Sequence, residues 1–306
     1  MQCPACGGPT AEPRRYPVVE FMLETGDVFH YEPCTRCGTS AIVDPPADLG
    51  RYYPSDYEPF AVRRGVIPAV RRRFGLDDRW RAVRRVGARA DARVLDAGCG
   101  SGDFLRTLAV QGFRDLTGVD PFLPFEPRVE GPCRFVRGDV AALGGERFDL
   151  VTAHHVIEHA PDPRRFLREI AAVLAPDGAV LVRAPLLDSW AARTYGARWV
   201  QHDAPRHLVL LTTDGMDRAA EAAGLRVTDR WRDEGRWQAW AGATLAAGRN
   251  PFRASGLGVR LGRFRYSAAA RRRNREGTGD SGCFVLRHAA ATGARAAGGP
   301  TPAPGA

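Results

Sequence analysis

One segment of the chain constrains its fold more than any other, namely residues 93–104, RVLDAGCGSGDF. It begins with an apolar run that suits a central parallel strand and continues through a glycine loop into a helix start. The loop glycines, Gly98, Gly100 and Gly102, lack the side chains that would keep a ligand away from the backbone. Asp96 stands at the carboxyl end of the expected strand. The segment therefore predicts an α/β fold with a nucleotide-like ligand at this strand end.

The residues that follow repeat an alternation of strands and helices. Further strand-like runs lie at Leu116–Asp120, Arg134–Asp139, Phe148–His154 and Ala179–Arg183. Between the last two, Pro163–Leu174 has apolar residues at helical spacing and predicts an amphipathic helix. Asp120 lies 22 residues after Gly98, close to the spacing of a ribose-binding carboxylate. This rhythm predicts a parallel sheet with crossover helices.

The run D-x-G-C-G-S-G at residues 96–102 closely resembles the first motif of class I S-adenosylmethionine-dependent methyltransferases. The order of the later strands agrees with that family over about residues 91–185. The resemblance implies a Rossmann-like, seven-stranded α/β sheet with helices on both faces, spanning residues 91–288. It also implies that Asp120 meets the ribose and Asp139 the adenine amino group of the cofactor. The cofactor-binding residues that it assigns are Asp96, Gly98, Gly100, Gly102, Asp120 and Asp139.

The remainder of this domain is expected to hold an insertion and two further strands. Residues 190–211 form the insertion, whose D-x-P-R-H-L run recurs in small-molecule methyltransferases that resemble this chain. A helix over Thr213–Ala223 and a strand over Leu225–Arg232 follow. The family fold places the last strand, Gly282–Arg287, antiparallel beside that strand. Residues 289–306 are rich in Ala, Gly and Pro and are expected to be disordered.

Two CxxC pairs, each followed by glycine, lie near the amino terminus: Cys3 with Cys6, and Cys34 with Cys37. Four thiolates in this arrangement can close a tetrahedral zinc site. We predict a structural zinc ion in a zinc-ribbon-like module over residues 1–45. Iron in a rubredoxin-like site would use the same ligands, whereas a redox-active CxxC is disfavoured because there are two pairs.

Residues 46–90 form the expected linker between this module and the catalytic domain. Its RYYPSDY run looks like the YYP-x-x-Y segment of some zinc-ribbon methyltransferases that act on sugars and other natural products. The resemblance makes Tyr52, Tyr53 and Tyr57 candidates for the acceptor side of the site, with simple packing of the linker as the alternative. Residues 62–90 are expected to form one or two basic helices, broken around Gly75.

The composition indicates which binding partners and which cellular compartment to expect. No run of 18 apolar residues occurs, and the start MQCPACGG does not read as a signal peptide, so we expect no transmembrane segment and a cytoplasmic protein. A net charge of +9 would ordinarily suggest a nucleic-acid partner. All 44 basic residues are arginines, which indicates a coding bias instead. The clusters at 63–85 and 260–275 are interpreted as solvated faces, with a phosphate-bearing substrate or an anionic membrane surface as alternatives. The oligomeric state is not defined by these features.

Methyl transfer to a hydroxyl group needs a base with a pKa near neutrality, and histidine suits that role. His154 and His155 end the fourth strand, where the family places groups that face the acceptor, and His207 lies on the insertion. We rank His155 first and His207 second as the catalytic base. We expect His159 to be satisfied by backbone groups and Asp162 to cap the following helix.

The segment 155–159, HVIEH, also resembles the E-x-x-E-H stretch of ubiquinone-pathway O-methyltransferases, in which acids and a histidine can hold a divalent metal. Here His155 replaces the first acid. A magnesium ion prefers oxygen ligands, so we predict no catalytic metal.

The leading hypothesis is an S-adenosylmethionine-dependent enzyme (EC 2.1.1.-) that methylates oxygen or carbon of a small metabolite, such as a sugar, glycoside or secondary metabolite. The main alternative is an RNA methyltransferase acting on ribosomal RNA, since some of these also pair an amino-terminal zinc module with this fold. HHVIEH stands where amine-methylating members carry an NPPY-type motif, which favours the small-molecule acceptor. A third hypothesis, a non-enzymatic binding module, is disfavoured by the complete glycine loop and by both acids that follow it.

Overall fold

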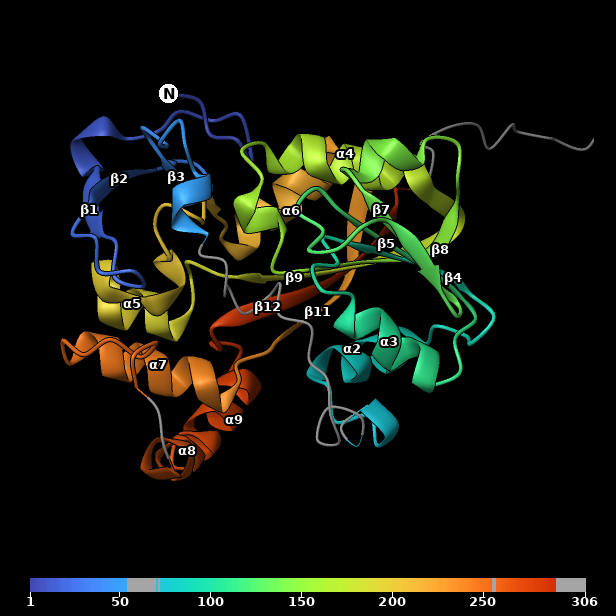
Figure 1. The fold of residues 1–306 in the computed structure, drawn as a ribbon. Coiled ribbons are helices and arrows are strands. Elements are labelled where there is room, and N and C mark those ends of the chain that lie inside the picture. Colours follow the sequence, from blue (N-terminus) through green and yellow to red (C-terminus); the bar gives the residue numbers. More distant parts are fainter. Residues whose placement is uncertain (54–69, 71, 255–256, 290–306) are drawn as a thin grey trace, which may run out of the picture.

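The computed structural model describes residues 1–53, 70, 72–254 and 257–289. Two sheets organise this part of the chain (Figure 1). The larger sheet has eight strands in the order β11-β12-β9-β8-β4-β5-β7-β6. In chain order these strands are β4 (Arg93–Ala97), β5 (Asp115–Asp120), β6 (Arg128–Glu130), β7 (Cys133–Arg137), β8 (Phe148–His154), β9 (Leu174–Pro185), β11 (Leu225–Arg232) and β12 (Ser281–His288).

The directions of these strands match the expected fold. β4 pairs in parallel with β5 and β8, and the parallel pairing continues outward to β7 and β9. β12 lies antiparallel between β9 and β11, as predicted for the last strand. The short β6 adds an antiparallel edge strand to the seven that the sequence predicts. The prediction of a Rossmann-like α/β sheet with an antiparallel last strand is confirmed.

Helices cover both faces of the larger sheet. α2 (Asp78–Val86) and α3 (Asp103–Val110) lie on one face, and α4 (Pro163–Val173) and α6 (Thr213–Ala222) lie on the other (Figure 1). Each helix contributes buried apolar side chains to the core on its own side, so the sheet separates two hydrophobic clusters. A sheet covered in this way exposes its functional groups at the strand ends.

α4 illustrates how local sequence defines an element. The carboxylate of Asp162 accepts a hydrogen bond from the amide of Arg165 at 3.0 Å, which caps the helix start as predicted. Pro163 occupies the first turn, where its missing amide hydrogen costs nothing. Leu167 and Ile170 are completely buried against the sheet. The helix is therefore both started and oriented by its own residues.

The smaller sheet belongs mainly to the amino-terminal module. Its order is β1 (Tyr16–Val19), β2 (Val28–Pro33), β3 (Ser40–Ile42) and β10 (Val209–Leu210), all antiparallel. β10 comes from the segment that the sequence analysis treated as an insertion in the catalytic domain. The module is therefore joined by main-chain hydrogen bonds to a segment from much later in the chain.

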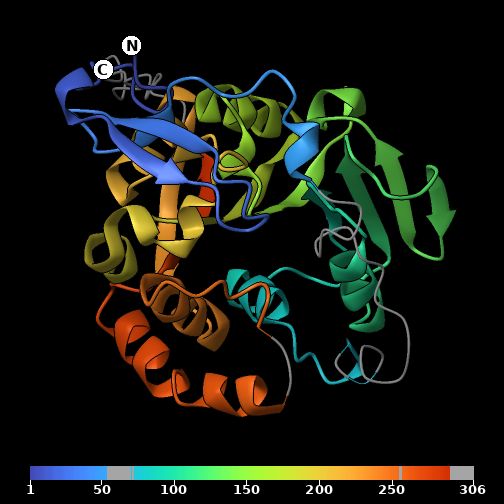
Figure 2. The same cartoon turned by 60° about the vertical axis from the view of Figure 1, so that its left-hand side comes forward.

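A helical group lies beside the larger sheet. It contains α5 (Trp190–Tyr195), and α7 (Arg236–Ala246), α8 (Leu257–Phe264) and α9 (Ser267–Arg275), which connect β11 to β12 (Figure 2). Short 3-10 helices complete the described elements: η1 (Glu12–Arg14), η2 (Gly50–Tyr52), η4 (Val140–Leu143), η5 (Ile157–His159), η6 (Gly196–Arg198) and η7 (Val200–His202). Among the described residues, no helix has the length and apolarity needed to cross a bilayer.

The linker is described only in part. Gly75 has a φ of +59° and precedes α2, so the expected break at this glycine is present. Tyr57 and the other residues of 54–69 lie outside the described residues, as does the predicted tail from residue 290.

Candidate active site

The glycine loop joins β4 to α3 at the carboxyl edge of the larger sheet. Gly98 and Gly102 have φ values of +74° and +73°, a region that residues with side chains rarely adopt. A Cβ at Gly98 would lie 2.5 Å from Cγ2 of Val156, and a Cβ at Gly102 would collide with the ring of Phe135. The loop therefore needs glycine for its backbone and for space. The backbone amides at the start of α3 can bind an anionic group here.

Asp120 ends β5 and braces this loop. Its Oδ2 accepts a hydrogen bond from the amide of Gly100 and its Oδ1 accepts one from Phe122, both at 2.8 Å. Burial raises the pKa of this carboxyl group above its ordinary value, while the two amides act in the opposite direction. A carboxylate has about four acceptor positions, so two remain for hydroxyl groups of a ligand.

Asp96, at the end of β4, is the most deeply buried acid of the loop region. Burial raises its pKa to about 7, although the Thr152 hydroxyl, which donates to Oδ1 at 2.7 Å, and the charge of Arg79 both act to lower it. Arg79 lies in the first turn of α2, pairs with Asp77 at 2.7 Å and sits 4.7 Å from the Phe104 ring centre. Arg79 belongs to the arginine cluster at 63–85, which its sequence alone indicates to be a solvated face. No spacing marks it as a site residue, because its direction depends on how α2 packs.

Asp139 lies just beyond β7 at the same edge of the sheet. Its residue is exposed, and its side chain makes no capping hydrogen bond to the 3-10 helix η4 that begins after it. The predicted third strand, 134–139, is shifted to Cys133–Arg137, which leaves the carboxylate beyond the strand.

His154 is the last residue of β8 and points toward α3. Its ring lies edge-on to Phe104, with 5.0 Å between ring centres. Burial lowers the pKa of His154 well below its ordinary value, so the ring is neutral. Neither ring nitrogen has a hydrogen-bond partner among the described residues.

His155 follows with a φ of +56°, an uncommon conformation for a residue that bears a side chain. Its amide donates to the carbonyl of Arg183 at 2.8 Å, which fixes this turn to β9. Its Nδ1 lies 3.2 Å from Oε1 of Glu158, whose side chain is 1% exposed, whereas the His155 side chain is 32% exposed. A partly exposed imidazole is therefore paired with a buried carboxylate.

Glu158 has further histidines beside it. The rings of His159 and His207 lie at 4.8 Å, edge to face. The Nδ1 of His159 lies 2.9 Å from the carbonyl oxygen of Arg206, so the expectation that backbone satisfies this histidine is met. Burial lowers the pKa of His207 to about 4. The structure therefore brings together His155 and His207, the two predicted bases, around one carboxylate.

Comparison with known proteins identifies the family. A family model described as a methyltransferase domain matches residues 71–230, just over half of the chain. The ubiquinone biosynthesis O-methyltransferase of Azorhizobium caulinodans is 30% identical over 184 residues, which cover 55% of this chain and 70% of that protein. The chain belongs to the S-adenosylmethionine-dependent methyltransferase family. The resemblance inferred from the glycine loop is thus confirmed.

Two further proteins are similar to this methyltransferase. The ubiquinone biosynthesis O-methyltransferase of Rhizobium leguminosarum bv. trifolii is 29% identical over 154 residues. The match covers 45% of this chain and only 60% of the length of that relative. The solved structure of Burkholderia thailandensis 1,6-didemethyltoxoflavin-N1-methyltransferase, with 1,6-didemethyltoxoflavin and S-adenosylhomocysteine bound, is 21% identical. The structural match covers 85% of this chain and 95% of the Burkholderia chain, with a TM-score of 0.45.

The amino-terminal module of the methyltransferase gathers its four predicted metal ligands. The sulfur atoms lie 3.7 Å apart for Cys3 and Cys37, and 3.5 Å apart for Cys6 and Cys34. All four lie within 4.8 Å of one another. A zinc ion with bonds of about 2.3 Å to tetrahedral thiolates holds the sulfur atoms about 3.8 Å apart. Two of the sulfur atoms also accept backbone amides, at 3.4 and 3.3 Å. The set therefore fits a tetrahedral ion that favours thiolates.

Residues 203–212, here called the ribbon-bound segment, attach the methyltransferase domain to this module. The completely buried hydroxyl of Tyr31 in β2 donates to the carbonyl of His207 at 2.7 Å. The buried guanidinium of Arg206 bonds both oxygens of Asp203, at 3.0 and 2.6 Å, and the carbonyl of Tyr52 at 2.8 Å. It also lies 3.4 Å from Glu20 of the module. The position of His207 therefore depends on the amino-terminal fold, a link that no spacing in the sequence reveals.

The two described tyrosines of the linker have different surroundings. Tyr52 is completely buried, and its hydroxyl donates to Asp27 at 2.6 Å, which corresponds to the packing alternative. Tyr53 is half-buried and stacks on Phe122 at 6.2 Å between ring centres. Its hydroxyl lies 3.3 Å from Nδ1 of His159. Of these two tyrosines, Tyr53 is thus the one that lies beside the histidines.

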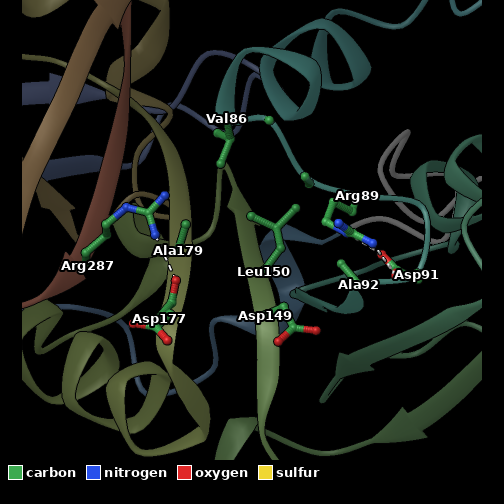
Figure 3. Close-up of a pocket in the computed structure, with 11 residues that line it drawn as sticks. Val86, Arg89, Asp91, Ala92, Asp149, Leu150, Asp177, Ala179 and Arg287 are labelled. Atoms are coloured by element: carbon green, nitrogen blue, oxygen red, sulfur yellow. Dashed lines mark hydrogen bonds and ion pairs between the residues drawn. The ribbon is translucent and has the colours of Figure 1, made fainter.

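A pocket at the other edge of the sheet is separate from this site (Figure 3). Arg287 on one side donates to the carbonyl of Asp177 at 2.8 Å, and Arg89 on the other side pairs with Asp91 at 2.8 Å. Asp149 and Leu150 lie between them at the amino end of β8. Because the glycine loop lies at the carboxyl ends of the parallel strands, this pocket lies at the opposite edge of the sheet from the candidate site.

Proposed function

We propose that this methyltransferase transfers the methyl group of S-adenosylmethionine to a hydroxyl group of a small metabolite, such as a sugar, glycoside or secondary metabolite. The observation that carries the proposal is the pairing of His155 with the buried Glu158 beside the glycine loop. The intervening residue Val156 occupies the space that a Cβ on Gly98 would need, so the histidine turn and the loop are in direct contact. The relatives named as O-methyltransferases support the same reaction class.

In this proposal the loop region binds the cofactor. S-adenosylmethionine supplies an electrophilic methyl group on a sulfonium. The sulfur is a good leaving group because it departs as a neutral thioether, without help from an acid. The loop amides and Arg79 meet the methionyl carboxylate, Asp96 meets the positively charged part of the methionyl group, and Asp120 uses its remaining acceptor positions for the ribose hydroxyls. Asp139 meets the adenine amino group. The residues with these roles are Asp96, Gly98, Gly100, Gly102, Asp120 and Asp139, joined by Arg79.

His155 acts as the general base. In the neutral ring Nδ1 donates to Glu158, so the lone pair is on Nε2, which can take the hydroxyl proton of the acceptor. The acceptor oxygen then bonds to the methyl carbon as the carbon–sulfur bond breaks, which leaves a methyl ether and S-adenosylhomocysteine. Burial alone would raise the pKa of Glu158, but the hydrogen bond with His155 and the neighbouring histidines lower it below its ordinary value. The carboxylate is therefore ionised and stabilises the imidazolium that forms.

His207 has a different part. Burial lowers its pKa to about 4, so the ring is neutral and is a poor proton acceptor at neutral pH. Its Nδ1 is occupied by the carbonyl of Gln201 at 2.7 Å. We propose that His207 helps to position the acceptor and does not take its proton.

We also propose that Cys3, Cys6, Cys34 and Cys37 bind a structural zinc ion. Four thiolates fill the coordination sphere, so the ion takes no part in the chemistry. Its effect is to fold the module that carries Tyr31 and Glu20, and through them to hold the ribbon-bound segment.

The test is transfer of labelled methyl groups from S-adenosylmethionine to fractionated cell extract, with RNA, protein and small metabolites separated. We expect label in the small-metabolite fraction. His155→Ala should lower kcat about 100- to 1000-fold, because a general base contributes about that much, and leave the affinity for S-adenosylhomocysteine within about threefold. His30→Ala, at an exposed position in β2, is the matched control. Label confined to RNA, or full activity of His155→Ala, would overturn the proposal.

A further inference from the structure

We propose that Glu158, His159 and His207 form a binding site for a divalent transition metal ion, separate from the four cysteines. The ligand atoms of these three residues lie within 4.8 Å of one another. Glu158 and His159 belong to η5, whereas His207 belongs to the ribbon-bound segment. Metal binding at this site does not depend on the proposed methyl acceptor, whereas the catalytic role argued below rests on the proposed function.

The tautomers of both histidines are fixed by backbone carbonyls. Nδ1 of His159 lies 2.9 Å from the carbonyl oxygen of Arg206, and Nδ1 of His207 lies 2.7 Å from that of Gln201. A carbonyl oxygen only accepts hydrogen bonds, so each Nδ1 carries the proton and each Nε2 keeps its lone pair. Histidines that bind metals are oriented in the same way, by a hydrogen bond from the ring nitrogen that does not bind.

The third ligand is the buried carboxylate of Glu158, of which one oxygen is available to a metal ion. Oε1 of Glu158 is engaged with His155, but Oε2 has no hydrogen-bond partner within the described part of the chain. An ionised oxygen left alone in a buried position is costly, and a bound cation would remove that cost. Glu158 would thus bind the ion with one oxygen and hold His155 with the other.

This set differs from the one considered in the sequence. There, the HVIEH segment offered His155, Glu158 and His159 to an ion that prefers oxygen, and no catalytic metal was predicted. In the structure, His155 is not part of the group of close ligand atoms, and His207 joins from a distant segment. Two imidazoles and one carboxylate suit zinc or a similar ion rather than magnesium.

The geometry leaves room for a substrate. Ligand bonds of about 2.1 Å in a tetrahedral site hold the ligand atoms about 3.4 Å apart, so rotation of the side chains by about 1 Å closes the site. Three protein ligands leave one position open. A hydroxyl group bound there would lose its proton more readily, and His155 lies beside the same carboxylate to accept it.

Cobalt(II) provides the test, because thiolate ligands give it an intense near-ultraviolet charge-transfer band and nitrogen and oxygen ligands do not. The full chain is equilibrated with cobalt(II), freed of unbound ion by gel filtration, and analysed for metal and by absorption. We expect about two ions per chain, one with the thiolate band and one with visible bands only. Glu158→Gln and His207→Ala should each lower the count to about one and leave the thiolate band unchanged. His30→Ala, exposed in β2, should keep both ions.

The outcomes separate the two sites and the two proposals. A count of about one in the wild type, or a second ion that persists in both variants, would overturn the proposal. Glu158→Gln keeps the size of the side chain, so it remains informative if His207→Ala unfolds, which circular dichroism would reveal. The metal count needs no methyl acceptor, so it stands or falls independently of the activity measured with cell extract.

Discussion

The two halves of the proposed site are built in different ways. The cofactor half comes mainly from one continuous stretch, in which β4, the glycine loop, α3 and β5 follow one another along the chain, with Arg79 and Asp139 added from either side of it. The acceptor half combines η5, the ribbon-bound segment and the amino-terminal module, which are far apart in the sequence. In the first half, most residues belong to one short run of the chain. In the second, the residues are brought together by hydrogen bonds between distant segments.

This difference indicates which substitutions should affect only one half of the proposed site. A change in the amino-terminal module should alter the acceptor half and spare cofactor binding, because no strand of the cofactor half pairs with the smaller sheet in the described residues. Changes at the glycine loop should abolish cofactor binding and leave the module folded. The predictions below test this separation, beginning with the largest effect.

The largest effect is expected for Asp120→Ala. The substitution removes the carboxylate that accepts amides from Gly100 and Phe122 and that faces the ribose in the proposed function. Loss of charge-assisted hydrogen bonds worth about 3 kcal/mol in total should weaken S-adenosylhomocysteine binding about 100-fold, measured by calorimetry. Asp115→Ala, an exposed acid at the start of the same strand, is the control and should bind normally. Unchanged affinity of Asp120→Ala would show that the ribose lies elsewhere.

A smaller effect is expected for Cys37→Ser, which removes one thiolate from the proposed zinc site. The module should loosen and release β10 and His207, so kcat should fall at least about tenfold while the affinity for S-adenosylhomocysteine stays within about threefold. Loss of about one zinc ion per chain should accompany the change. Cys133→Ala removes a buried thiol from the larger sheet and is the control. An equal loss of cofactor affinity in Cys37→Ser would mean that the two halves are not separate.

More of the cofactor half than of the acceptor half could be predicted from the sequence, because the acceptor half depends on contacts between distant segments. β8 and β11 begin and end at the predicted residues, and α4 begins at the predicted proline. These elements are specified by apolar periodicity and by caps that lie within a few residues. β10 has only two residues and exists through its pairing with β3, so periodicity could not reveal it. The residues around β10 do not indicate that it pairs with β3, which is far away in the sequence.

Individual site residues follow the same rule. The glycines and Asp120 were proposed as site residues from their spacing along the chain. Arg79 and Arg206 were not, because one arginine among many is marked only by what it packs against. The ring contact between His159 and His207 likewise depends on the ribbon-bound segment.

Two buried acids, Asp96 in the cofactor half and Asp280 just before β12 and outside both halves, allow a comparison by pH. Burial raises the pKa of both Asp96 and Asp280 to about 7. Because the unfolded value is about 3.9, each acid adds stability that is complete below about pH 4 and is lost as the pH rises through about 7. Asp96→Asn and Asp280→Asn cannot ionise, so each should gain on the order of 2 kcal/mol relative to wild type between pH 5 and pH 8, measured by urea unfolding.

Cofactor binding should distinguish the two acids. Ionised Asp96 attracts the positively charged methionyl group in the proposed function, so wild-type affinity for S-adenosylmethionine should rise with pH through about 7. Asp96→Asn should flatten that rise. Asp280→Asn should keep it, because this acid is engaged with the indole of Trp199 at 2.6 Å and the hydroxyl of Ser189 at 3.3 Å. A flat profile in both variants would contradict the assignment of Asp96 to the cofactor.

The smallest effect is expected for Tyr31→Phe, which deletes a single hydroxyl. That hydroxyl donates to the carbonyl of His207 at 2.7 Å from a completely buried ring, so its loss leaves an acceptor unpaired and should cost about 1 kcal/mol of stability. His207 should then be held less firmly, and kcat should fall about threefold to tenfold with unchanged affinity for S-adenosylhomocysteine. Tyr16→Phe loses a comparable bond, to His202 at 3.2 Å, without touching the ribbon-bound segment. If both variants lose activity equally, the effect belongs to the general stability of the module. If only Tyr31→Phe does, one hydrogen bond between distant segments positions the acceptor half.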